Sequence, residues 1–170
     1  MQTDDNEDFY LLEAETYDRG LNRIIERLSE KITRDTLVQQ TTDRLRYSLK
    51  VDRLVLYYFY RQWEGRVTFE SLSDARFSIY GSTGPDQCFN DEYAALYLAG
   101  RIRAIPDIKI EPIAECHREF LQNLQVRANL VTPILTHKGL WGLLVAHQCQ
   151  FPRFWSSSDI ELMQAGAQTL

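Results

Sequence analysis

The sequence has few cysteines, and their spacing argues against a metal site. Its 170 residues include three cysteines, Cys88, Cys116 and Cys149, with no CxxC pair among them. This odd number predicts neither a disulfide framework nor a structural zinc site, and we expect reduced thiols. A lone free cysteine usually packs as a small hydrophobic side chain, so only the neighbouring residues can give these three a function.

Positive charge is also scarce, and long apolar runs are missing. Nineteen Lys and Arg face twenty-four Asp and Glu, a net charge of −5 that repels a phosphate backbone and argues against nucleic-acid binding. The longest apolar and aromatic run, Leu54 to Tyr60, is too short to span a bilayer, and the start "MQTDDNEDF" is too acidic for a signal peptide. We expect a cytoplasmic protein with no membrane span, or a piece of one.

The composition suits one compact domain with an appended helix, because 44% of the residues are hydrophobic and 12% are aromatic. Residues 1–8 are acidic and polar, and we expect them to be frayed or disordered. Apolar residues then recur at helical steps, at Tyr10, Ala14, Tyr17, Leu21, Ile24, Leu28 and Ile32. This stripe fits equally a helix lying on the domain's own sheet and the seam of a dimeric bundle. The domain prediction is an N-terminal segment at 1–32 and a globular domain at 33–170.

The pattern of the globular part predicts an α+β fold, in which helices flank an antiparallel sheet. Predicted helices cover 33–49, 89–100 with Asn90 as cap, 112–124, and the C-terminus from Ser156. Predicted strands cover 53–60 and 66–72 as a hairpin, then 101–105, 129–135 and 140–148. The long segment 73–87 reads as a loop, and ordered loops of that length are usually functional.

Four short motifs go beyond this pattern. They are "CH" at 116–117, "VRANLVTPIL" at 126–135, "LWGLLVAHQC" at 140–149 and "PRFW" at 152–155. Together and in this order they closely resemble the bilin-binding GAF domains of the phytochrome superfamily, specifically the cyanobacteriochromes. The upstream "DQCF" at 86–89 resembles the DxCF motif of their dual-cysteine subgroup.

The resemblance implies a photoreceptor domain with a GAF fold that holds one linear tetrapyrrole, phycocyanobilin and/or phycoviolobilin. It implies a permanent thioether at Cys116 and a reversible bond from Cys88 to the central methine bridge. Photoisomerisation would then switch the domain between blue or violet and green or teal absorption. It also implies an output domain in the parent chain, of histidine kinase, methyl-accepting or cyclic-di-GMP type, and allows a homodimer through terminal helices.

The chemistry of a bilin assigns further residues. A protonated bilin is a buried cation, which needs hydrogen-bonding or anionic neighbours, and its propionates need cations. By the resemblance, Asp86 contacts the pyrrole nitrogens, His117 flanks the chromophore, and Arg101 binds a propionate. Arg103 and Lys109 are weaker candidates for that second role. The expected pocket walls are Phe89, Tyr93, Tyr97 and His147.

Two other functions remain open. The first is a GAF module that senses a cyclic nucleotide or metabolite, although such a module needs no nucleophile at Cys116. The second is a cysteine-dependent enzyme activated by His117, His137 or His147. Adjacent helix positions such as 116 and 117 point in different directions, so we expect no enzyme.

Overall fold

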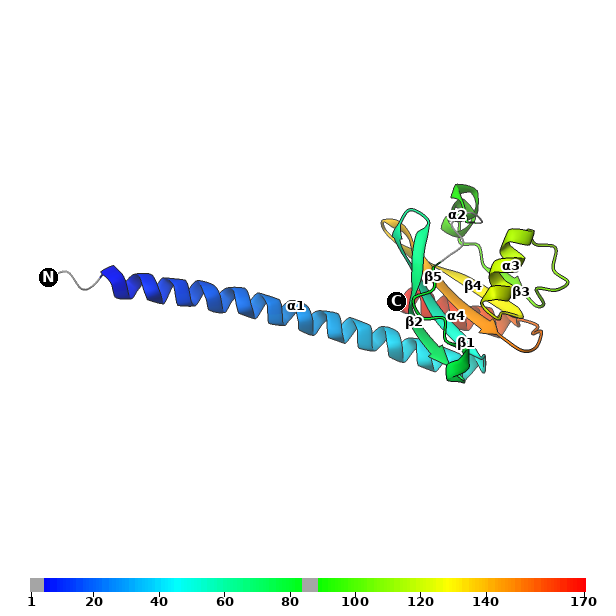
Figure 1. Cartoon of the computed structure of the whole chain (residues 1–170), viewed down its shortest axis with the longest axis horizontal. Coiled ribbons are helices and arrows are strands. Elements are labelled where there is room, and N and C mark those ends of the chain that lie inside the picture. Colours follow the sequence, from blue (N-terminus) through cyan, green and yellow to red (C-terminus); the bar gives the residue numbers. More distant parts are fainter. Residues whose placement is uncertain (1–4, 84–88) are drawn as a thin grey trace. The chain divides into compact units, whose positions relative to one another are not determined.

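The computed structural model describes the backbone of residues 5–83 and 89–170 and the side chains from residue 16 onward within those ranges (Figure 1). Contacts divide the chain into two units, Met1–Leu37 and Val38–Leu170. Asp86 and Cys88 lie outside the described residues, and so does the start of the chain up to residue 4.

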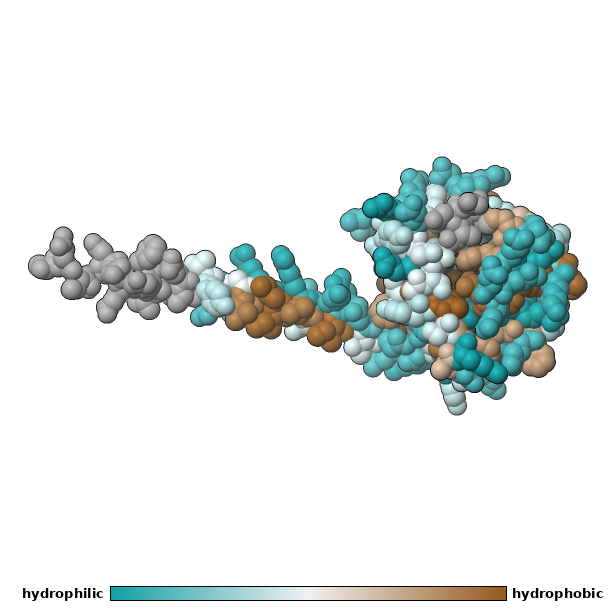
Figure 2. Space-filling view, viewed as in Figure 1, coloured by the Kyte–Doolittle hydropathy of each residue, from teal (hydrophilic) through white to brown (hydrophobic). Residues whose placement is uncertain are grey.

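A single helix, α1, spans Asp5–Leu49 and corrects two expectations. Residues 5–8 are helical instead of disordered, and the two predicted helices are one. The reason lies at the expected junction, where the hydroxyls of Thr33 and Thr36 donate to the carbonyls four residues earlier instead of capping a new helix. The described side chains from 16 to 37 are all exposed, including the apolar ones, and Figure 2 shows them along α1.

The second unit is built on a five-stranded antiparallel sheet in the order β2-β1-β5-β4-β3. The strands are β1 (Arg53–Arg61), β2 (Glu64–Leu72), β3 (Arg103–Ile105), β4 (Ala128–Thr136) and β5 (Gly139–Gln148). This confirms the predicted α+β class and the hairpin of β1 and β2. Gly65 is required in that hairpin, because a Cβ there would collide with the backbone of Tyr58.

One face of the sheet carries the main core. Leu54, Leu56, Leu130 and Leu144 are all fully buried there, and they cluster with Met163. Met163 belongs to α4 (Ser157–Thr169), and the end of α1 joins the same cluster through Leu45 and Leu49. The N-terminus of α4 is fixed by a reciprocal capping box of Ser156 and Asp159, as the serines predicted.

The other face carries a short 3-10 turn, η1 (Ala75–Phe77), and two helices, α2 (Asp91–Leu98) and α3 (Glu115–Asn123). Asn90 caps α2 with hydrogen bonds from the amides of Glu92 and Tyr93, as predicted. Helix α3 begins later than the expected residue 112, because residues 112–114 have no regular secondary structure and Ala114 offers no capping side chain. The late start leaves Cys116 in the first turn.

Candidate ligand pocket

A cavity of about 690 Å³ lies between the sheet and the layer of α2 and α3. Its floor includes Val55, Val145 and Val131, which are cross-strand neighbours in β1, β5 and β4 and therefore point to the same side of the sheet. Small-molecule sites commonly have volumes of about 300–1,000 Å³. The cavity therefore has room for a ligand the size of a cofactor.

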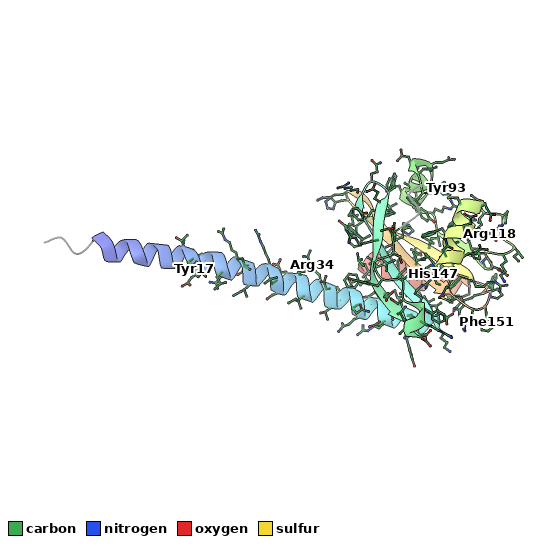
Figure 3. The ribbon with its side chains drawn as sticks, in the orientation of Figure 1. Tyr17, Arg34, Tyr93, Arg118, His147 and Phe151 are labelled. Atoms are coloured by element: carbon green, nitrogen blue, oxygen red, sulfur yellow. The ribbon has the colours of Figure 1, made fainter. Side chains whose placement is uncertain are left out.

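The cavity brings together most of the residues that the sequence singled out. Its lining includes Cys116, His117, Arg101, Phe89, Tyr93, Tyr97 and His147. Arg103 also lines it, whereas Lys109 is exposed outside it. In Figure 3, Tyr93 comes from α2 and His147 from the sheet, on two different layers around the cavity.

Cys116 is the second residue of α3 and is exposed at the cavity. Its sulfur is disulfide-bonded in this structure, so the expectation of a reduced thiol is wrong for Cys116 but is confirmed for Cys149. Cys149 is a free, half-buried thiol outside the cavity lining, and burial raises its pKa to about 11. A thiol with that pKa is a poor nucleophile at neutral pH, so Cys149 does not compete with Cys116 for a reactive role.

Two arginines give the cavity a positive wall. Arg101 and Arg103 both line it, and Arg103 lies 3.7 Å from Glu111, its ion-pair partner. Burial lowers the pKa of His117, and the charges of these two arginines lower it further. His117 is therefore neutral at physiological pH, and the positive wall favours a ligand that carries carboxylates.

A cluster of aromatic rings forms another part of the cavity lining, and the guanidinium of Arg101 lies over one of them, Tyr97. Phe89 stacks on Tyr97 at a centroid distance of 5.9 Å, and Phe59 lies 5.4 Å from Phe89. Trp63, in the tip of the β1–β2 hairpin, meets Phe89 edge-on at 5.8 Å. Sequence reasoning missed Phe59 and Trp63. The alternation of Tyr57 and Phe59 along a strand was the available signal, but alternation does not say which face holds the pocket.

Next to the three valines, the same face of the sheet carries buried polar side chains. His147 is 3% exposed, and its Nδ1 accepts a 3.0 Å hydrogen bond from Nε of Arg53. Burial, followed by the charge of Arg53, holds the pKa of His147 well below its usual range. Asn129 is the cross-strand neighbour of His147 and also lines the cavity. The sequence did not single out Arg53 or Asn129, because an arginine or an asparagine in a strand usually faces solvent.

The second unit thus combines an antiparallel sheet, helices on both of its faces and a cavity on one of them. A family model described as "GAF domain" matches residues 33–170, and the chain belongs to that family. No helix among the described residues is long and apolar enough to cross a membrane, and those residues hold no cluster of metal-binding side chains.

Related sequences occur in cyanobacteria. An uncharacterized protein of Picosynechococcus is 51% identical over 154 residues, which cover 91% of this chain and 94% of that protein. A putative methyl-accepting chemotaxis protein of Synechocystis is 37% identical over 142 residues, which cover 84% of this chain but only 14% of the relative. The chain thus corresponds to nearly all of one relative and to a small part of the other.

Solved structures show the same fold. The blue-light absorbing form of the Thermosynechococcus elongatus PixJ GAF domain superposes with a TM-score of 0.74 at 35% identity, covering 82% of this chain and 86% of that one. The phycocyanobilin-bound GAF domain of a cyanobacterial phytochrome gives a TM-score of 0.73 at 27% identity, covering 89% and 90%. These matches confirm the GAF fold.

Proposed function

We propose that this chain is a photosensory domain that holds a linear tetrapyrrole in the cavity over its sheet. The observation that carries the proposal is a cavity of about 690 Å³ that joins a cysteine in the first turn of a helix, a positive wall and an aromatic wall. The phycocyanobilin-bound and blue-light absorbing GAF domains of the same fold support it. When bound, a bilin supplies visible absorption and a double bond that isomerises in light.

The residues present fit such a group. Its flat conjugated rings suit an apolar floor and the stacked rings of Phe89 and Tyr97. Its two carboxylates suit the guanidinium groups of Arg101 and Arg103, which pair well with planar anions. Neutral His117 and His147 hydrogen-bond to the ligand without adding positive charge next to a cationic ring system.

Cys116 is the proposed attachment residue. Its thiol adds across a carbon–carbon double bond of the ligand, so that the sulfur bonds to one carbon and the hydrogen passes to the neighbouring carbon. The addition needs no oxidant or reductant, but it does need the reduced thiol. The start of a helix favours the reactive thiolate, and Cys116 lies in the first turn of α3. Attachment therefore requires reducing conditions.

We propose that the chain belongs to the dual-cysteine subgroup, and the "DQCF" motif supports this. Cys88 supplies a second thiol that bonds reversibly to the middle of the conjugated system, and Asp86 accepts hydrogen bonds from the pyrrole nitrogens. With Cys88 bonded, conjugation is shorter and absorption moves to blue or violet. With Cys88 released, the domain absorbs green or teal light. Phycocyanobilin and phycoviolobilin are the bilins we propose.

We also propose a place in signalling. The domain works in the cytoplasm as a sensory module without enzymatic turnover, and it controls an output domain of histidine kinase, methyl-accepting or cyclic-di-GMP type. The chemotaxis relative and circadian input-output histidine kinases of Synechocystis and Thermosynechococcus support the first two types of output.

The apolar stripe of α1 suits a homodimer as the route of the signal. Tyr17, Leu21, Ile24 and Leu28 are spaced four, three and four residues apart and are exposed, as in the seam of a two-stranded coiled coil. Ile24→Lys should convert a dimer to a monomer in sedimentation velocity, whereas Glu26→Lys, off the stripe, should not. A wild-type chain that sediments as a monomer at high concentration contradicts the dimer.

The test of the sensory function is photochemical. The chain is coexpressed with enzymes that make phycocyanobilin, purified under reducing conditions, and its absorption spectrum is recorded before and after illumination. We expect visible absorption and a reversible shift between two bands. A colourless protein contradicts the proposal and favours a GAF module for a cyclic nucleotide or another metabolite.

A further inference from the structure

Three buried polar residues form a row across the sheet. Arg53 of β1, His147 of β5 and Asn129 of β4 are successive cross-strand neighbours and are 0%, 3% and 2% exposed. Polar groups are costly to bury unless they are hydrogen-bonded, and a buried charge is the costliest. The hydrogen-bond partners of Arg53 therefore show which groups offset the cost of burying its charge.

The guanidinium of Arg53 bonds to three separate segments around the cavity. Its Nε donates to Nδ1 of His147 at 3.0 Å, its Nη1 to the carbonyl of Phe77 at 2.6 Å, and its Nη2 to the carbonyl of Leu124 at 2.6 Å. Phe77 ends η1, and Leu124 is the C-terminal cap of α3. Among the described residues, no carboxylate forms an ion pair with it.

These contacts dictate the protonation of His147. A guanidinium has five donors and no acceptor, so Nδ1 of His147 must be the acceptor and carries no proton. Burial and the adjacent cation keep the ring neutral, which leaves its single proton on Nε2. His147 lines the cavity, whereas Arg53 does not. His147 thus carries its one donor, the Nε2 proton, on the ring nitrogen that Arg53 does not contact.

We propose that Arg53 is a positioning residue that holds His147 in the tautomer protonated at Nε2 and fixes the orientation of its ring at the cavity. Through the carbonyls of Phe77 and Leu124, the same side chain ties β1 to η1 and to the end of the helix that bears Cys116. The role does not depend on which ligand fills the cavity, and it is testable on the protein without ligand.

The first test uses the wild-type chain. Nitrogen-15 NMR of ligand-free protein labelled at histidine reports the two ring nitrogens separately, and His147→Gln identifies the resonances of His147. We expect an unprotonated, hydrogen-bonded Nδ1 and a protonated Nε2 for this residue. A proton on Nδ1 overturns the proposal whether or not any variant folds.

The second test separates the hydrogen bond from the charge. Arg53→Met removes both, and Arg53→Lys keeps a cation but puts a methylene group where Nε was. We expect the Nδ1 resonance of His147 to leave its hydrogen-bonded position in both variants. Arg127→Met, which removes an arginine bonded to Asp107 instead, is the matched control and should leave it unchanged. Unchanged His147 resonances in Arg53→Lys overturn the proposal.

Discussion

The indole of Trp63 and the carboxylate of Asp91 join the tip of the β1–β2 hairpin to the first turn of α2. Nε1 of Trp63 donates to Oδ1 of Asp91 at 2.6 Å. These residues lie 28 positions apart in the sequence, in a turn and at a helix start, and Trp63 lines the cavity. Trp63 also packs edge-on against Phe59 and Phe89, so one side chain links both elements to the wall.

Trp63→Phe tests this link, because it keeps an aromatic ring but removes the donor. A hydrogen bond to a charged group contributes about 1.5–3 kcal/mol when it is protected, and less in an exposed position such as this one. We expect faster amide hydrogen exchange in α2 and little change in the sheet. Trp141→Phe, at the surface beside Tyr58, is the control. Equal exchange rates in α2 for Trp63→Phe and wild type contradict the link.

The ion pair of Asp107 and Arg127 predicts a pH effect on stability. Its two hydrogen bonds of 2.7 and 2.8 Å tie the loop after β3 to the start of β4. Hydrogen bonding to Arg127 lowers the pKa of Asp107 from 3.8 to about 2. A lowered pKa in the folded state stabilises the protein above about pH 4, and this stabilisation is lost as the pH falls toward 2.

Asp107→Asn should therefore be less stable than wild type at neutral pH and should lose less stability on acidification. Urea unfolding at pH 7 and at steps down to pH 2 measures both effects. Glu115→Gln, which removes an exposed carboxylate paired with Arg118, is the control and should follow wild type. If Asp107→Asn and wild type keep the same difference in unfolding free energy at every pH, this account of the pair is wrong.

Arg101 gives a prediction about ligand binding. A charge-assisted hydrogen bond of about 1.5–3 kcal/mol corresponds to a tenfold or larger change in affinity. Arg101→Gln should therefore weaken binding of free bilin by about tenfold or more, measured by titrating ligand-free protein in which Cys116→Ala prevents covalent attachment at that residue. Lys109→Gln changes an exposed cation outside the cavity and should bind as wild type does. Equal weakening by both variants would point to net charge instead of a contact.

Cys88 gives a prediction about colour. Cys88→Ala removes the proposed second bond and should abolish the short-wavelength state, while the protein keeps a covalent pigment and its longer-wavelength absorption. The measurement is the absorption spectrum of each protein after illumination to a steady state. A blue or violet state that persists in Cys88→Ala contradicts the dual-cysteine mechanism.

Much of the fold could be predicted from local signals. The β1–β2 hairpin, the Asn90 cap and the start of the last helix at Ser156 were all predicted, because each depends on residues close together in the sequence. The continuity of α1 was missed, because Thr33 is equally able to cap a helix or to bond back within one.

Site residues that belong to a sequence motif could be predicted, whereas Arg53, whose role depends on tertiary contacts, was missed. Cys116, His117 and His147 belong to the motifs at 116–117 and 140–149 and do line the cavity. The role of Arg53 depends on contacts that only the folded chain makes. His147 lies opposite it in the sheet, and the carbonyls of Phe77 and Leu124 bond to its other two nitrogens. No short stretch of sequence contains that arrangement.

Covalent attachment at Cys116 is the central claim, and one measurement tests it most directly. Wild type, Cys116→Ala and Cys149→Ala are coexpressed with bilin synthesis, denatured under reducing conditions, separated on a gel and examined for zinc-induced fluorescence. Cys149 serves as the matched control because its thiol is free but lies outside the cavity lining. The account predicts a fluorescent band for wild type and Cys149→Ala and none for Cys116→Ala. A fluorescent Cys116→Ala band, or a dark wild-type band, would contradict it.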